Sequence, residues 1–168
     1  MTSLPAAYWI DRLHLTRHVE GGWYGEVYRA DLLFTQQQLP DSFTGTRPSS
    51  THIYFLLEKG NFSAFHRIKS DELWHFYYGD PLTIYEIDKD GKLIEHLLGN
   101  DPSAGQSFFC CIKAGNWFGS KVNAESNYSL VGCTVSPGFD FADFEMADRS
   151  ALLKEFPHYE EIITTLTR

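Results

Sequence analysis

Short runs rich in Val, Ile, Tyr, Phe and Trp follow one another through the middle of the chain, and they constrain its fold more than any other feature. Clusters of Gly, Asn, Asp and Pro separate many of the runs, and the dipeptide Asp90-Gly91 is a strong signal for a β-hairpin. Many short strands at nearly regular spacing indicate a sandwich or a barrel. The predicted strands are 23–29, 52–57, 64–68, 72–77, 82–87, 92–98, 107–112, 117–122 and 129–135.

Helices are predicted on both sides of this strand-rich region, which spans about 20–140. The N-terminal helix is predicted at 5–18, because a proline near its start suits a first helical turn. Two short helices are predicted within 148–166, where they would pack on the barrel. The polar segment 32–50 is expected to form a long loop or a frayed hairpin. The whole chain, 1–168, is expected to form a single domain.

The charge balance of the chain restricts its partners. Lys plus Arg number 14 and Asp plus Glu number 22, which gives a net charge of −8. An acidic chain repels nucleic-acid phosphates and anionic lipids, so we expect neither nucleic acid nor membrane as a partner. The cysteine count is odd, and Cys110 and Cys111 would point to opposite faces of one strand. Reduced thiols and a cytoplasmic location are therefore expected.

The clearest candidate chemistry lies between Gly60 and Gly79. By strand parity, His66 points to the same face as Ala64 and Ile68, which lie two positions away on either side. Glu72 opens the next run, and it could meet His66 across an antiparallel ladder, an arrangement that serves a general base or a metal ligand. His75 has the opposite parity to Glu72 and would need a bulge to reach the same face. A core histidine and a solvated glutamate are the alternative interpretation.

The same stretch resembles the first motif of the cupin superfamily. Four residues fall in register with that motif: Gly60, His66, Glu72 and Gly79. The second histidine of the motif is replaced by Ile68. Segment 113–118 resembles the second cupin motif, with Lys113 at the position of its proline and Phe118 at the position of its histidine.

More specifically, the chain resembles an uncharacterised family, the fifth cupin domain family. Four segments carry this resemblance and span Glu20 to about Phe156: 20–29, 53–57, 66–75 and 131–139. The resemblance implies an all-β fold, a cupin-type antiparallel β-barrel or jelly roll, with an N-terminal helix and short C-terminal helices. It also implies a pocket at the barrel mouth and a homodimer. Strand 23–29 is the candidate interface, since edge strands invite pairing across a two-fold axis.

The two replaced histidines bear on the cofactor. The resemblance implies a metal site of three His and one Glu, but Ile68 and Phe118 cannot coordinate a metal ion. Two protein ligands rarely suffice, so no cofactor is predicted. A divalent metal held with the help of His52 or His75 is the less favoured alternative.

Three classes of function follow for a small-molecule ligand. By analogy with metal-independent sugar-nucleotide epimerases, His66 is the candidate base, Glu72 or Asp71 its partner, and His75 the next catalytic candidate. The acid would come from Tyr54, Tyr85 or Tyr128. The alternatives are a non-catalytic binding module and a metal-dependent cupin enzyme with a degenerate site.

The ligand itself is not identified by the sequence, and neither is turnover. Aromatic side chains could stack on a ring or a sugar, and a cationic side chain could hold an anionic group. The leading candidates for ligand binding are Tyr54, Trp74, Trp117, Tyr128 and Arg29. Further candidates are Tyr24, Tyr28, Phe76 and Lys113. The simpler interpretation is that the aromatic residues belong to the barrel wall and that the cationic residues are surface charges.

Overall fold

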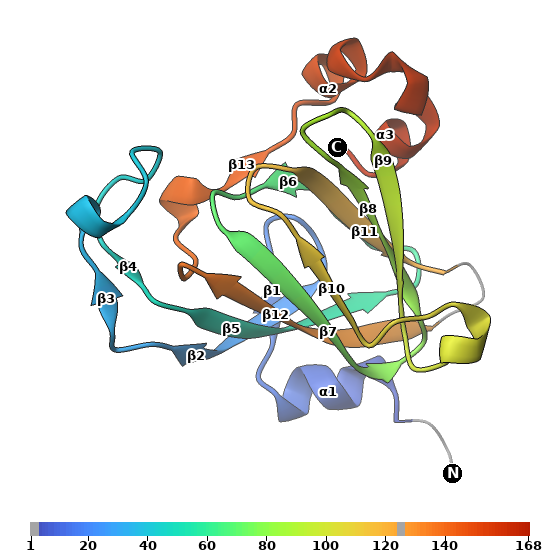
Figure 1. The fold of residues 1–168 in the computed structure, drawn as a ribbon. Coiled ribbons are helices and arrows are strands. Elements are labelled where there is room, and N and C mark those ends of the chain that lie inside the picture. The colour runs from blue at the N-terminus through green and yellow to red at the C-terminus, as the bar shows by residue number, and fades with distance from the viewer. Residues whose placement is uncertain (1–3, 124–126) are drawn as a thin grey trace.

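Two antiparallel sheets face each other in the computed structural model, which describes residues 4–123 and 127–168 (Figure 1). The six-stranded sheet has the order β1-β2-β5-β12-β7-β10, and the five-stranded sheet has the order β13-β6-β11-β8-β9. Helices flank this core at both ends of the chain. The predicted all-β fold class is confirmed, and the core of the molecule lies between the two sheets.

The strands agree closely with the predicted runs. The six-stranded sheet contains β1 (Thr16–Arg17), β2 (Trp23–Arg29), β5 (Thr51–Glu58), β12 (Tyr128–Ser136), β7 (Asp71–Gly79) and β10 (Phe109–Ile112). The five-stranded sheet contains β13 (Glu145–Met146), β6 (Phe62–Arg67), β11 (Trp117–Val122), β8 (Leu82–Ile87) and β9 (Leu93–Leu98). In the 32–50 segment, β3 (Leu33–Phe34) and β4 (Arg47–Pro48) pair around the 3-10 helix η1 (Gln36–Gln38).

Alternation along the strands decides which side chains enter the core. On β7, Glu72, Trp74 and Phe76 are buried, whereas the residues between them are more exposed. Trp74 packs against Phe55 of β5, and its ring centroid lies 5.8 Å away. The predicted opposite parity of Glu72 and His75 is therefore confirmed.

The N-terminal helix is shorter than predicted. α1 (Ala6–Arg12) ends before His14, which takes a left-handed backbone conformation with φ of 53°. The chain then forms β1, which pairs with the first residues of β2. Leu15 is buried here with Leu56 and Leu130, and this tertiary contact favours a turn over further helix. The prediction of helix from 13 to 18 is wrong.

The C-terminal helices cover the outer face of the five-stranded sheet. α2 (Arg149–Glu155) is followed by the 3-10 helix η4 (Pro157–Tyr159) and by α3 (Glu160–Thr165), as predicted. Leu152 and Ile163 pack in one apolar cluster with Phe65 and Trp117 of the sheet. Figure 1 shows these helices at the C-terminal end of the molecule, on the opposite side from α1. None of the helices in the described ranges is long and apolar enough to span a membrane.

The predicted dimer depends on β2, which lies near one edge of its sheet. β1 covers only Trp23 and Tyr24, so in the described structure the rest of β2 pairs with β5 alone. Tyr28 and Val27 on this edge are exposed. Exposed edge strands can pair with a second chain, and the homodimer stays a prediction.

Candidate functional site

A cavity of about 290 Å³ lies between the two sheets. Residues from β2, β5, β7 and β12 line one side of it, His66 of β6 lines the other, and segment 139–144 lies across it. The cavity stands out because it gathers buried ionisable groups and aromatic rings in one hollow. We call its buried polar group the floor, which consists of His18, Glu20, His66, Glu72 and Cys133.

The remaining charged lining residues form the rim, which consists of Glu26, Arg29 and Asp140. Glu26 and Arg29 are three residues apart, a spacing that would place them on opposite faces of a regular strand. A bulge between Glu26 and Tyr28 returns Arg29 to the cavity side. Arg29 then donates two hydrogen bonds to Glu26, from Nε at 2.9 Å and from Nη2 at 2.7 Å.

A glycine turn places Glu20 on the floor. Gly21 and Gly22 follow it with φ of +119° and +70°, values that favour glycine. A Cβ at Gly21 would collide with the backbone oxygen of Phe62 on β6. The carbonyl of Glu20 accepts a hydrogen bond from the backbone N–H of Ala64 at 2.8 Å, which fixes the turn against β6.

Replacing Gly21 by Ala should therefore displace Glu20 and lower stability. A left-handed residue next to a backbone collision is expected to cost about 2 kcal/mol in unfolding free energy. Urea denaturation would measure the loss. Gly105→Ala is the matched control, because Gly105 also has a positive φ of 76° but open space at its Cβ. An equal loss of unfolding free energy in both variants would show that the collision contributes nothing and that backbone strain alone causes the loss.

Glu20 is the centre of a buried hydrogen-bond group. Its Oε2 lies 3.2 Å from His66 Nε2 and 3.4 Å from His18 Nδ1, and its Oε1 accepts a hydrogen bond from Ser63 Oγ at 2.9 Å. Burial alone would raise the pKa of Glu20, but the charge of His66 and the hydrogen bonds from His18 and Ser63 outweigh burial and lower it. Glu20 is therefore ionised at neutral pH.

His66 faces acceptors through both ring nitrogens. Its Nδ1 lies 2.7 Å from the carbonyl oxygen of Ala64, which can only accept, so Nδ1 carries a proton. Its Nε2 faces the ionised Glu20, which is also an acceptor. Both ring nitrogens of His66 are therefore occupied, Nδ1 by the carbonyl oxygen of Ala64 and Nε2 by the carboxylate of Glu20.

Glu72 lies on the same cavity in the opposite protonation state. Its side chain belongs to the six-stranded sheet, and the residue is only 7% exposed. Burial raises the pKa of Glu72 to about 8, and repulsion from Glu20 adds to the rise, while a hydrogen bond with Cys133 opposes it. Glu72 is therefore a neutral carboxylic acid at pH 7 and can donate a proton.

The predicted direct pairing of His66 with Glu72 is wrong. β6 and β7 belong to different sheets, so no ladder joins them, and the two residues instead face the cavity from opposite sides. The carboxylate partner of His66 is Glu20. Asp71, the other predicted partner, accepts hydrogen bonds from the Lys113 ammonium at 2.5 Å and from the backbone N–H of Ala114 at 2.9 Å, away from this cavity.

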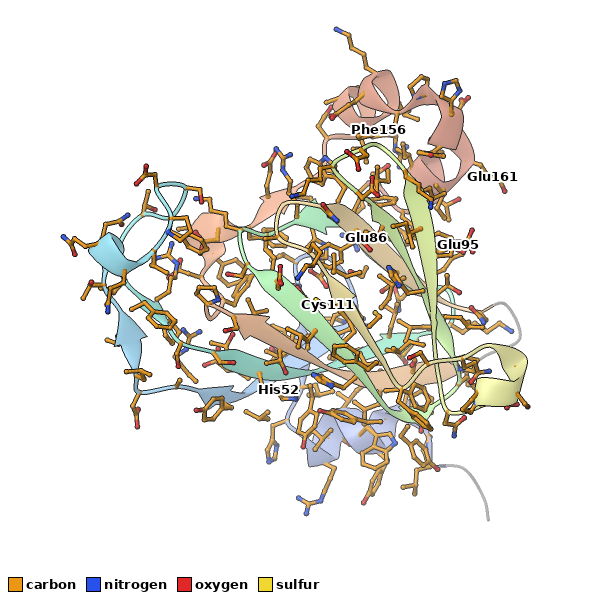
Figure 2. All side chains as sticks on the ribbon, in the orientation of Figure 1. His52, Glu86, Glu95, Cys111, Phe156 and Glu161 are labelled. Carbon is orange, nitrogen blue, oxygen red and sulfur yellow. The ribbon has the colours of Figure 1, made fainter. Side chains whose placement is uncertain are left out.

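The third predicted catalytic residue, His75, does not reach the cavity. It lies on the outer face of the six-stranded sheet, where its Nε2 is 3.1 Å from Thr134 Oγ1. Its strand is regular at this point, so parity turns it away from Glu72. His52 shares this outer face and is labelled in Figure 2 on the side of the sheet where α1 lies. Tyr54 belongs to the same outer group, with its ring 5.8 Å from that of Tyr77.

Among the five leading candidates for ligand binding, Arg29 lines the cavity and the other four lie elsewhere. Trp74 belongs to the solid core behind the cavity wall. Trp117 packs under the C-terminal helices, with the guanidinium of Arg67 over its ring at 4.3 Å. Tyr128 packs near α1, and its hydroxyl donates to the carbonyl of Leu4 at 2.6 Å.

The other candidates divide in the same way. Tyr24 lines the cavity, whereas the predicted acids Tyr54, Tyr85 and Tyr128 do not. Tyr85 lies on the outer face of its sheet, 5.5 Å from the ammonium of Lys121, and Tyr28 is exposed. Phe76 is a core residue, and Lys113 is bound to Asp71.

Sequence reasoning missed His18, Glu20 and the aromatic segment 139–144. Glu20 belongs to a turn, where no strand periodicity marks the direction of a side chain. Its position directly before Gly21-Gly22, within the segment that carries the family resemblance, is the one available signal. His18 was included in the predicted helix, which concealed its approach to Glu20.

The residues at the cupin metal positions do not fit a metal ion. Ile68 and Phe118 are buried there, and the ring of Phe118 packs at 4.1 Å from that of His66. The substitutes considered from the sequence, His52 and His75, are on the outer face of the other sheet. Within residues 4–123 and 127–168, no group of three or more His, Cys, Asp or Glu side chains could hold a metal ion. No chemical step is therefore derived through a metal.

Two facing antiparallel sheets with a ligand-sized cavity between them are the architecture of a cupin. The sequence motifs indicate the same class of protein, and comparison with known proteins agrees. The chain belongs to the family described as Cupin superfamily (DUF985), whose profile matches residues 7–147.

Two solved structures resemble the chain over nearly its whole length. A protein from Shewanella oneidensis is 40% identical, with 98% of each chain covered and a TM-score of 0.88. A hypothetical protein from Leishmania major is 34% identical, with 98% of this chain and 99% of that chain covered and a TM-score of 0.88. Oxalate decarboxylase from Bacillus subtilis is 16% identical, with 94% of this chain and 37% of that chain covered and a TM-score of 0.56, and shows the fold alone. No curated protein matches the chain.

Proposed function

We propose that the protein binds a small molecule in this cavity and transfers a proton to it from Glu72, without a metal. The substrate class is a carbonyl or sugar-like compound, whose oxygen atom can accept that proton. The volume of about 290 Å³ lies at the lower end of the range for ligand pockets, which supports a compact substrate over a nucleotide sugar.

One observation carries the proposal. Glu20 and Glu72 are both buried at one cavity, yet the pKa of Glu20 is lowered and that of Glu72 is raised to about 8. Pairs of titratable groups whose surroundings separate their pKa values supply the acid and the fixed charge of many active sites. A carboxylic acid with a pKa near neutrality can also release its proton readily during turnover.

The proposal assigns different roles to the two sides of the cavity. Glu72 donates its proton to a carbonyl oxygen of the substrate, and the resulting Glu72 carboxylate takes the α-proton, so that the enol forms and Glu72 is again protonated. Glu20 is the fixed anion that orients the ring of His66. This revises the predicted role of His66 as a free base, because both of its nitrogens already face acceptors. The same saturation of His66 supports the second candidate function, a binding module without turnover.

Hydrogen exchange with solvent tests the proposal without knowledge of the product. We would incubate the protein in D₂O with a panel of hydroxy ketones, amino ketones, aldoses and keto acids, and follow loss of the α-proton signal by ¹H NMR. Binding of each compound would be measured in parallel by thermal shift. We expect Glu72→Gln to bind the active compound within about threefold of the wild type and to lose exchange by at least a hundredfold.

Glu161→Gln is the matched control, since Glu161 is exposed on α3 and should change neither quantity (Figure 2). Chelator treatment should also leave exchange unchanged. Binding without exchange in the wild type would select the binding module. Exchange that survives in Glu72→Gln would rule out Glu72 as the proton donor.

A further inference from the structure

Aromatic rings form most of the cavity wall between the floor and the rim. Segment 139–144 contributes Phe139, Phe141 and Phe144, with ring centroids between 5.0 and 6.3 Å apart. The ring of His18 lies 4.6 Å from that of Tyr24 and 6.3 Å from that of Phe141, and it links the segment to β2. The result is a continuous aromatic lining that reaches the exposed Phe141 at the mouth.

The rim does not offer an anion a free cationic partner. Arg29 uses Nε and Nη2 on Glu26, and its Nη1 donates to the carbonyl of Phe139 at 3.3 Å. Its positive charge is thus offset by the carboxylate of Glu26. Asp140 accepts the backbone N–H of Ala142 at 2.8 Å, and among the described residues no Lys or Arg nitrogen lies within ion-pair distance of it.

The floor offers an anion no free cationic partner either. The ionised Glu20 lies against the ring of His66, and Glu72 is uncharged at pH 7. Glu20 lies against His66 and Glu26 is bonded to Arg29, so Asp140 is the described lining carboxylate without a direct cationic partner, and the charges of Arg29 and Arg47 act on it only at longer range. The protein as a whole has a net charge of −8, so its field attracts cations and repels anions.

We propose that the ligand of this cavity is a compact organic cation, such as a substituted ammonium. The inference rests on the proposed function, in that it names the charge of the molecule bound there. The faces of aromatic rings carry negative potential and attract a cation within about 6 Å, and the carboxylate of Asp140 adds to that attraction. A carboxylate or phosphate ligand would instead lie among these aromatic rings and beside the carboxylate of Asp140.

Three probes of the same shape and different charge test this inference. Choline is a cation, 3,3-dimethylbutan-1-ol is its uncharged carbon isostere, and 3,3-dimethylbutyrate is a related anion. Dissociation constants would be measured by NMR titration at low ionic strength. We expect choline to bind at least tenfold more tightly than the alcohol and the anion to bind most weakly. Equal binding of choline and the alcohol, or tighter binding of the anion, would overturn the inference.

Two variants locate the binding at the aromatic lining and the rim. Phe141→Ala should weaken choline binding about fivefold, whereas Phe108→Ala should not change it, although both rings are 56% exposed. Asp140→Asn should weaken choline binding and spare the alcohol, because an amide can still accept the hydrogen bond from Ala142. Asp101→Asn is its control, since Asp101 also accepts backbone N–H groups at the start of a 3-10 helix.

The outcomes separate this inference from the proposed function. If a neutral or anionic compound of the exchange panel binds in the cavity and choline does not, only the charge assignment fails. If no compound of either panel binds, the proposed function fails with it. Loss of choline binding in Phe108→Ala, or unchanged binding in Phe141→Ala, would place the cation at another surface and overturn the inference.

Discussion

Between pH 5 and pH 8 the wild-type protein is expected to lose about 3 kcal/mol of unfolding free energy through Glu72, and the variant Glu72→Gln is expected to keep it. The carboxyl group is buried beside Glu20 and Cys133, and its pKa in the folded protein is about 8, against an ordinary value of 4.5. The unfolded chain therefore loses this proton near pH 4.5, whereas the folded protein keeps it to about pH 8.

The sign of the effect follows from proton binding. Between these two pKa values the folded state binds more protons than the unfolded state, so a rise in pH favours unfolding. Each unit of pKa difference corresponds to 1.36 kcal/mol, and the destabilisation from Glu72 is complete above the folded pKa. Glutamine has no proton to lose, and the variant should keep its stability where the wild type declines.

Urea denaturation at pH 5, 6, 7 and 8 would measure the difference between the two proteins. Glu161→Gln serves as the control, because an exposed carboxylate should leave the pH profile of the wild type unchanged. Parallel profiles for the wild type and Glu72→Gln would show that Glu72 is ionised in the folded protein at neutral pH. The proposed proton donor would then be lost.

The fold could be predicted because its signals are local. The longer strands are marked by runs of β-branched and aromatic residues with turn residues between many of them, and the sequence Asp90-Gly91 does lie between β8 and β9. The two-residue strands β1, β3, β4 and β13 carry no such signal and were not among the predicted strands. Parity also placed His66 and Glu72 on inward faces, where both line the cavity. Parity does not tell which sheet a strand joins. The predicted ladder between His66 and Glu72 was wrong because β6 and β7 belong to different sheets.

The remainder of the site depends on non-local or irregular structure. Glu20 reaches His66 through a glycine turn, Arg29 reaches the cavity through a bulge, and neither feature has a periodic signal. The aromatic segment 139–144 is tied to β4 by an ion pair between positions 96 residues apart, Arg47 and Asp143. Long-range contacts of this kind are visible only once the chain is folded.

The ion pair between Arg47 and Asp143 is bidentate and buried. Arg47 donates from Nε to Asp143 Oδ2 at 2.6 Å and from Nη2 to Oδ1 at 2.8 Å, and both side chains are 3% exposed. Asp143→Asn leaves the guanidinium buried without its counter-charge, and we expect it to lower the unfolding free energy by about 3 kcal/mol. The control is Glu145→Gln on the adjacent strand β13, which breaks an exposed pair with Arg67 and should cost less than about 1 kcal/mol.

A double variant separates the cost of an orphaned charge from the value of the pair itself. Replacing a buried ion pair by apolar residues is often close to neutral, so Arg47→Met with Asp143→Leu should be more stable than Asp143→Asn alone. If the double variant is the less stable of the two by urea denaturation, the pair is itself a major source of stability. In both variants the η3 turn (Phe141–Asp143) loses its ion pair with Arg47 of β4, so choline should bind more weakly to both variants than to Glu145→Gln. Unchanged choline binding would mean that Phe139, Phe141 and Phe144 hold their positions by packing alone.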